Sequence, residues 1–232
     1  MTGSPITLTN HDCEKLLEHI RTSCKGTKSY HKAIRNYCIA ILMLDAGMRV
    51  GEVVQLNIDD LYFLNESRYQ LRIREQIAKN HKERIVPLSN RIRKAIESMQ
   101  VHVWSGGPEH AGRWAFCSNQ WNTRLTTRQV ERIVRKAAMK SLGRPVHPHV
   151  LRHTFASRLM RTTNARIVQE LLGHEHLTTT QIYTHPNQED LKKAIGTLED
   201  ENAKLGVDLE NLAGLDSATN RPDAVDADGD MG

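Results

Sequence analysis

The chain has 232 residues and a net charge of +5, from 32 Lys and Arg against 27 Asp and Glu. Hydrophobic residues make up 39% of it, and no apolar run reaches the roughly 18 residues of a transmembrane helix, so we expect no membrane span. The four cysteines form no CxxC pair and no signal pattern begins the chain, which favours a reduced, intracellular protein over a secreted one.

The charge is unevenly distributed along the chain. Residues 199–232 contain ten Asp and Glu against two Lys and Arg, a balance of −8, which leaves +13 on residues 1–198. A basic body of this size favours a polyanionic partner, because neutralisation of phosphates dominates nucleic-acid affinity. The acidic segment is rich in small residues, so we expect a folded domain over 1–198 and a disordered tail over 199–232.

The first half of the chain predicts helices followed by short strands. The expected helices are 11–24, 30–46 and 51–56. The expected strands are 61–64, 69–73 and 84–88, with turns at 65–67 and 79–81. Asn10 should cap the first helix, and Gly47 should end the second in a left-handed conformation. The apolar run from Ile41 to Leu44 indicates that the second helix lies in the core.

The second half of the chain is predicted to be helical throughout. The expected helices are 89–103, 126–142, 148–162, 164–172, 178–184 and 187–198. Thr126 or Thr127 should cap the second of these, Gly143 should end it, and Gly173 should end the fourth. The predicted class is therefore α+β, mostly α-helical, with one small three-stranded antiparallel sheet.

Six side chains form the strongest functional pattern. In the segment HPHVLRHTFA a histidine and an arginine stand three residues apart, a second histidine follows the helix end LLG, and a tyrosine follows nine residues later. Another arginine lies in GMRVGE, and a lysine lies in a predicted hairpin turn. The set is Arg49, Lys79, His149, Arg152, His174 and Tyr183.

These residue types suit the cleavage of a phosphodiester without a metal ion. Arg49 and Arg152 remain charged and can each bind non-bridging phosphate oxygens with a planar fork, while the two histidines donate to the same oxygens or accept a proton. Tyr183 is the candidate nucleophile, and its phenolate is also a good leaving group, so a phosphotyrosyl bond permits religation. Lys79 can protonate the departing 5′ oxygen.

The motifs resemble the tyrosine recombinase (phage integrase) family over about residues 7 to 195. The resemblance implies the recombinase catalytic-domain fold, the six catalytic residues named above and no cofactor. It also implies a supporting role for Glu52, within GMRVGEVVQL, and we add His153 as a second supporting residue. Ala78 and Asn80 stand where glycines are common in the family, which leaves Lys82 as a substitute for Lys79.

The implied activity is site-specific recombination of double-stranded DNA through a 3′-phosphotyrosyl intermediate. We expect a homo-tetramer in the synaptic complex, a monomer or weak oligomer without DNA, and a cytoplasmic, nucleoid-associated protein. Only some 25 residues precede the Arg49 helix, so the chain is either an excised catalytic domain or a short single-domain recombinase. Six basic residues are candidate contacts to DNA phosphates, although each taken singly could be an ordinary solvated charge: Lys82, Arg84, Arg124, Arg128, Arg132 and Arg135.

Three other interpretations compete with recombination. His149 and His153 stand four residues apart and could bind zinc, but HVLRH lacks the glutamate of HExxH and Arg152 would repel a cation. A type IB topoisomerase would use similar groups to relax DNA. A non-catalytic DNA-binding regulator on the same fold is the third alternative, and the intact six-residue set argues against it because a pure binder does not need Tyr183.

Overall fold

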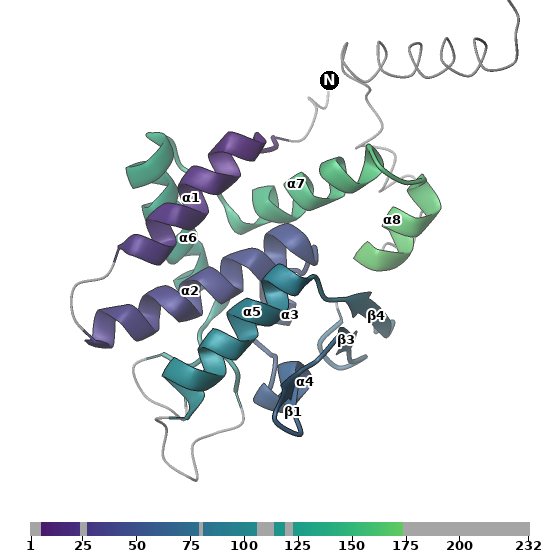
Figure 1. Cartoon of the computed structure of the whole chain (residues 1–232). Coiled ribbons are helices and arrows are strands. Elements are labelled where there is room, and N and C mark those ends of the chain that lie inside the picture. Colours follow the sequence, from purple (N-terminus) through teal and green to yellow (C-terminus); the bar gives the residue numbers. More distant parts are fainter. Residues whose placement is uncertain (1–5, 24–26, 79–80, 106–113, 119–122, 174–232) are drawn as a thin grey trace, which may run out of the picture. The chain divides into compact units, whose positions relative to one another are not determined.

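The computed structural model describes residues 6–23, 27–78, 81–105, 114–118 and 123–173 (Figure 1). The helices are α1 (Asn10–Thr22), α2 (Thr27–Asp45), α3 (Val50–Val53), α4 (Ile58–Leu61), α5 (Asn90–Met99), the π-helical turn η1 (Gln100–Trp104), α6 (Thr127–Leu142), α7 (Pro148–Met160) and α8 (Ala165–Leu172). The strands are β1 (Tyr62–Phe63), β2 (Glu66–Ser67), β3 (Gln70–Ile73) and β4 (Arg84–Pro87). No helix in these ranges is long and apolar enough to cross a membrane. The helices expected at 178–184 and 187–198, the acidic tail and the boundary at 198 lie outside the described residues.

Four of the predicted helices, α1, α5, α6 and α8, begin at side chains that accept from their first backbone N–H groups. α1 is capped by Thr9 rather than by the expected Asn10: the Thr9 hydroxyl accepts from the N–H of Asp12 at 3.1 Å, and the Asp12 carboxylate accepts from the N–H of Thr9 at 3.3 Å. This reciprocal capping box outweighs the single acceptor that Asn10 could offer. Thr126 and Gln129 form the same arrangement at the start of α6.

The β structure differs in detail from the expected three-stranded sheet. β1 pairs with β2 and β3 pairs with β4, each as a separate antiparallel pair. The turn predicted at 65–67 is wrong, because Leu64 and Asn65 form the turn and the chain is extended again at Glu66. Both turn residues have positive φ, 50° and 61°, as a type I′ hairpin requires. The fold class, mostly helical with a small amount of antiparallel β structure, is confirmed.

The helix α2 forms the centre of the core, as the sequence predicted. α1, α5 and α7 all pack against it, and it runs through the middle of the helices in Figure 1. The four residues from Ile41 to Leu44 are each at most 1% exposed, because neighbouring helices cover α2 on more than one side. α2 thereby holds the segment that follows it, which carries Gly47 and Arg49, in a fixed place.

Gly47 ends α2 in the left-handed conformation predicted for it, with φ +61°. A Cβ at this position would clash with the ring of Phe155, on α7, and would lie 2.9 Å from Cδ2 of Leu172, on α8. Gly47→Ala should therefore lower the free energy of unfolding by about 3 kcal/mol, from backbone strain together with overpacking. Gly143→Ala is the matched control, because Gly143 has φ +69° with no atom within 4 Å of its Cβ position. Urea unfolding should show that Gly143→Ala lowers the free energy of unfolding by only about 1 kcal/mol. Equal losses of stability in Gly143→Ala and Gly47→Ala would contradict the packing argument.

Candidate active site

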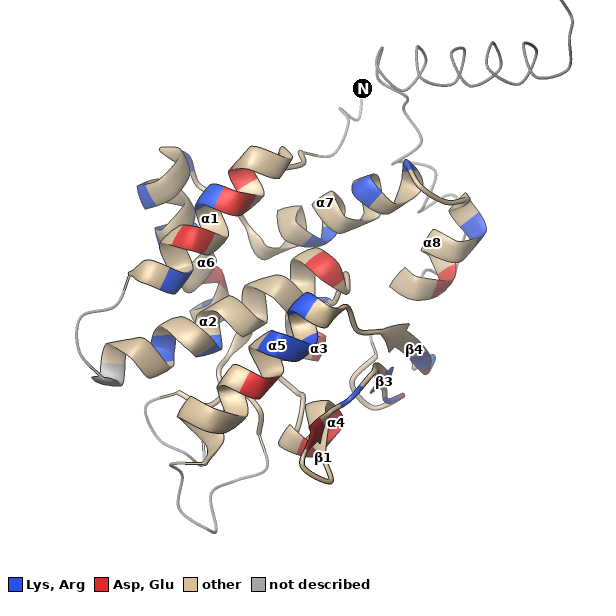
Figure 2. Cartoon of the chain, in the orientation of Figure 1, with Lys and Arg blue, Asp and Glu red and all other residues tan. Residues whose placement is uncertain are grey.

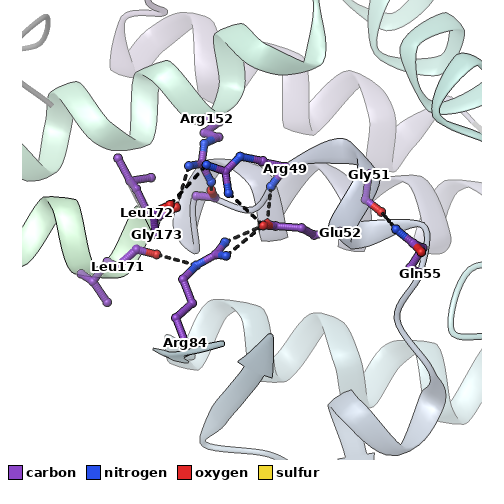
Figure 3. A network of polar contacts seen from close by, with 10 residues as sticks. Arg49, Gly51, Glu52, Gln55, Arg84, Arg152, Leu171, Leu172 and Gly173 are labelled. Carbon is purple, nitrogen blue, oxygen red and sulfur yellow. Dashed lines mark hydrogen bonds and ion pairs between the residues drawn. The ribbon is translucent and has the colours of Figure 1, made fainter. Parts of the chain in front are cut away.

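The carboxylate of Glu52 is the centre of the candidate site. It lies in the first turn of α3 and is 1% exposed. Its Oε2 accepts from the backbone N–H of Arg49 at 2.8 Å, and its Oε1 accepts from the Arg49 side chain at 3.0 Å. Arg84, from β4, donates to both oxygens, at 2.8 Å and 2.7 Å. Figure 3 shows the two guanidinium groups meeting at this one carboxylate.

Glu52 is held in its ionised form by these neighbours. Burial, the largest single influence, raises the pKa of the carboxyl group, but the hydrogen bonds and charge of Arg84, the N–H of Arg49 and the charge of Arg152 together bring the pKa below its ordinary value of 4.5. The carboxylate is therefore ionised at neutral pH, where it accepts from Arg49 and orients its side chain.

Arg152 joins the ends of two helices. It lies on α7 with 5% exposure, and its Nη1 donates to the carbonyl of Gly47, after α2. Its Nη2 donates to the carbonyl of Leu172, at the end of α8, at 2.8 Å. Carbonyls at helix C-termini carry partial negative charge, which stabilises a buried cation. Arg152 is consequently fixed in orientation by backbone groups from both sides.

The C-terminus of α8 gathers the arginines of the site. Three successive carbonyls there accept guanidinium donors: that of Leu171 from Arg84 at 3.0 Å, that of Leu172 from Arg152, and that of Gly173 from Arg49 at 3.5 Å. Gly173, with φ +62°, ends the helix as predicted. The structure thus brings together Arg49 and Arg152, which are far apart in the chain, at one helix end (Figure 3).

A cleft of about 620 Å³ opens beside Arg49. His149, which is exposed on the first turn of α7, lines the same cleft, so the structure places two of the predicted catalytic side chains around one space. At its edge the Nδ1 of His147 lies 3.0 Å from Glu131 of α6. The other lining residues are Val50, Gly51, Glu52, Gln55, Ile77, Thr127 and Pro148.

His153 lies one turn after His149 and is partly buried. Its burial lowers the pKa of the imidazole, and the nearby charges of His149 and Arg152 lower that pKa further. A neutral ring at physiological pH is thereby favoured, and a second positive charge next to Arg152 is avoided. No group of three His, Cys, Asp or Glu side chains in the described parts of the chain could hold a metal ion.

The remaining predicted catalytic residues, Lys79, His174 and Tyr183, lie outside the described residues. The nearest described positions are Ala78, which is buried, and Gly173. The proposed roles of these three side chains therefore stay predictions.

Five of the six candidate phosphate contacts are exposed. Lys and Arg lie on most of the elements drawn in Figure 2, including α6. On α6 the spacing of Arg128, Arg132 and Arg135 places them on one side of the helix, and Arg124 stacks over the ring of Trp114 at 5.1 Å. Lys82 is also exposed. These side chains can reach a ligand from solvent.

Arg84 does not fit the expectation of a solvated charge. It is 7% exposed and forms a buried, two-point ion pair with Glu52, because β4 directs alternate side chains inward and Arg84 shares the inward positions with Val86 and Leu88. That period-two pattern in RIVPL was visible in the sequence. The partner of Arg84 could not be inferred from the sequence, because Glu52 is 32 residues away.

The buried carboxylate predicts a pH-dependent stability. Glu52→Gln should lower the free energy of unfolding at pH 7 by about 3 kcal/mol, because it leaves Arg84 buried without its counter-ion. The folded-state pKa is depressed, so the wild type has this stabilisation above pH 4.5 and loses it as the pH falls through the folded pKa. Urea unfolding should therefore show that the difference in the free energy of unfolding between the wild type and Glu52→Gln becomes smaller below pH 4.5.

Glu83→Gln is the control for this measurement. Glu83 pairs with Arg72 at 2.8 Å, but both side chains are exposed, so its loss should change stability by less than about 1 kcal/mol. If Glu52→Gln lowers the free energy of unfolding by the same amount at pH 7 and at pH 3.5, the charge of the carboxylate is not the stabilising feature.

The model of the phage integrase family matches residues 7–190. The tyrosine recombinase XerC of Stutzerimonas stutzeri is 36% identical over 169 residues, which cover 72% of this chain and 54% of the relative. XerC of Neisseria meningitidis serogroup B is 38% identical over 154 residues, which cover 66% of this chain and 48% of the relative. The chain spans about half the length of the curated relatives it matches.

Two solved structures have the same fold. The XerA recombinase superposes with a TM-score of 0.68 at 31% identity, over 85% of this chain and 66% of the other. The XerH site-specific recombinase bound to its palindromic difH substrate, in a post-cleavage complex, superposes with a TM-score of 0.62 at 30% identity, over 85% of this chain and 54% of the other.

Proposed function

Since the chain belongs to the phage integrase family, that of the tyrosine recombinases, we propose that it cleaves and rejoins DNA strands through a 3′-phosphotyrosyl intermediate. Tyr183 is the nucleophile. The observation that carries the proposal is that Arg49 and Arg152 are both held at the end of α8, and that Arg49 lines a cleft together with His149. A stability role alone would not require a fixed guanidinium group and a histidine to line the same open cleft.

The arginines stabilise the charge that develops on the phosphoryl group. Each guanidinium keeps its charge at any working pH, and each is oriented before the substrate arrives, so little reorganisation accompanies the reaction. Arg49 is the more accessible of the two, with 18% of its side chain exposed. His149 donates to the same phosphate oxygens from the exposed side of the cleft.

The other catalytic roles follow from the sequence motifs. His174 assists at the phosphoryl group, Lys79 protonates the departing 5′ oxygen, and the phenolate of Tyr183 bonds to the 3′ phosphate. Strand rejoining reverses these steps: the 5′ hydroxyl attacks phosphorus, and the tyrosine leaves. The energy of the phosphodiester is kept in the phosphotyrosyl bond, so no nucleotide cofactor is needed.

Double-stranded DNA is the proposed partner. The exposed cations of α6, together with Lys82 and Arg124, contact phosphates, so the affinity should fall with increasing salt. Strand exchange takes place in a homo-tetramer that assembles on DNA, in the cytoplasm, and the acidic segment 199–232 is a tail outside the catalytic domain. The relatives named above are recombinases, which favours strand exchange over the relaxation of a type IB topoisomerase.

A nicked suicide substrate tests the proposal. When the strand downstream of the cleavage site is short, it diffuses away after cleavage and the protein remains covalently attached to the 3′ end. We expect an adduct that withstands denaturation, forms equally in EDTA and leaves a free 5′ hydroxyl. A 5′ phosphate, or a requirement for a divalent ion, would contradict the mechanism.

A further inference from the structure

Arg84 is a buried arginine that connects three segments of the candidate site. Its side chain is 5% exposed. Nε donates to the carbonyl of Leu171, while Nη1 and Nη2 donate to the two oxygens of Glu52. A Cβ added to Gly173 would lie 3.0 Å from Cδ of Arg84, so the arginine stem also packs against this glycine. β4, the start of α3 and the end of α8 are thus joined through one side chain.

The charges around Glu52 suggest what Arg84 does. Glu52 contacts Arg49 and Arg84, and without Arg84 its buried carboxylate would be balanced mainly by Arg49. A buried carboxylate attracts the nearest available cation strongly, because water does not screen it. Arg49 would then be neutralised by Glu52 and would have less net charge to offer a phosphate.

The same hairpin contains a second ion pair that lacks these features. Arg72 of β3 pairs with Glu83 at 2.8 Å, and the two side chains are 69% and 41% exposed. An exposed pair of this kind contributes little to stability and fixes little in position. The contrast indicates that burial and the contact with α8, rather than the presence of an ion pair in the hairpin, distinguish Arg84.

We propose that Arg84 is a positioning residue for strand cleavage: by neutralising Glu52 and holding the end of α8, it keeps the charge of Arg49 available for the scissile phosphate. This inference rests on the proposed function. Arg84 itself touches no DNA. It acts through Glu52 and the α8 carbonyl, so its removal should slow the chemical step and leave DNA affinity unchanged.

Single-turnover cleavage of the suicide substrate by the full chain tests the proposal, together with DNA affinity at several salt concentrations. Arg84→Gln should cleave about 100-fold more slowly, a loss similar to that of a donor at the reacting group. Its affinity and the dependence of affinity on salt should match the wild type. Arg84→Lys keeps the charge without the two-point geometry, so it should recover part of the rate, to about tenfold below wild type. Arg72→Gln is the matched control and should cleave at the wild-type rate.

A double variant separates the charge effect from a merely structural one. In Arg84→Gln/Glu52→Gln the net charge of the cluster returns to its original value, so this protein should cleave at least as fast as Arg84→Gln alone. If Arg84 served only as a scaffold, the losses of the two single variants would multiply. Should Arg84→Gln fail to fold, Arg84→Lys and the double variant still carry the test, because replacement of both members of a buried ion pair is tolerated better than removal of one.

Three outcomes would overturn the inference. The first is cleavage by Arg84→Gln and Arg84→Lys at the wild-type rate, and the second is multiplied losses in the double variant. The third is a salt dependence of binding that is reduced by about one phosphate contact even in the double variant, where Glu52 no longer neutralises Arg49, because that would make Arg84 a DNA ligand. If the wild type itself forms no adduct, the proposed function fails and the inference fails with it. If the wild type forms the adduct and Arg84→Gln cleaves equally fast, the inference is refuted and the proposed function stands.

Discussion

Tyr183→Phe should abolish the covalent adduct while the protein still binds DNA. Phenylalanine keeps the ring and loses only the oxygen that attacks phosphorus, so cleavage should fall by at least about 10⁴-fold, as expected when a nucleophile is removed. The affinity for DNA should change by no more than about tenfold, because one hydroxyl contributes at most one hydrogen bond. Denaturing electrophoresis of the trapped complex and a binding titration measure the two quantities separately.

The chain contains four other tyrosines against which this assignment can be checked. Tyr30→Phe is a suitable control, because Tyr30 lies on α2 and is 42% exposed, so its hydroxyl can be removed without disturbing the core. It should form the adduct at the wild-type rate. Peptide mapping of a wild-type adduct to Tyr30, Tyr37, Tyr62 or Tyr69 would refute the role of Tyr183.

A substrate with sulfur at the 5′ bridging position should separate the role of Lys79 from that of Arg152. A thiolate needs little protonation on departure, so this substrate should restore most of the activity of Lys79→Ala. It should leave Arg152→Ala at least about 100-fold impaired, because the charge on the non-bridging oxygens still lacks its partner. Rates of cleavage on the oxygen and sulfur substrates, compared for each variant, give the result.

Two further variants make this comparison secure. Arg152 is buried between helix ends, so Arg152→Lys, which keeps the charge, should be measured beside Arg152→Ala, with unfolding curves for both. Lys82→Ala tests the alternative lysine and should be close to wild type on both substrates. Rescue of Lys82→Ala rather than Lys79→Ala by sulfur would transfer the role of general acid to Lys82, and equal failure of Lys79→Ala and Arg152→Ala on sulfur would contradict the division of roles.

The parts of the fold that could be predicted from sequence are those set by local rules. Gly47 and Gly173 both end helices with positive φ, as predicted, because no other residue type adopts that conformation so readily. The burial of α2 from Ile41 to Leu44 was also predicted, from its continuous apolar sequence. Competing local signals produced the errors: Thr9 and Asn10 are both good caps, and only the partner three residues later, Asp12, decides between them.

The candidate site could be predicted only in part, because its geometry depends on contacts between distant residues. The motifs identified Arg49, Glu52 and Arg152, and the structure places them together. Periodicity alone could not have paired Arg152 with Gly47, 105 residues away. The burial of Arg84 could have been inferred from the alternation along β4, but its attachment to Leu171, 87 residues later, follows only from the folded chain.

The three acceptor carbonyls at the end of α8, those of Leu171, Leu172 and Gly173, have a thermodynamic consequence. Arginines from three other segments satisfy them, so the last turn of this short helix cannot open without releasing guanidinium donors from the site. Linkage is reciprocal: whatever binds those guanidinium groups must also alter the free energy of local opening of α8. Local opening of this helix of eight residues, measured by amide hydrogen exchange, and occupancy of the phosphate position are therefore coupled equilibria, and a shift in one changes the other.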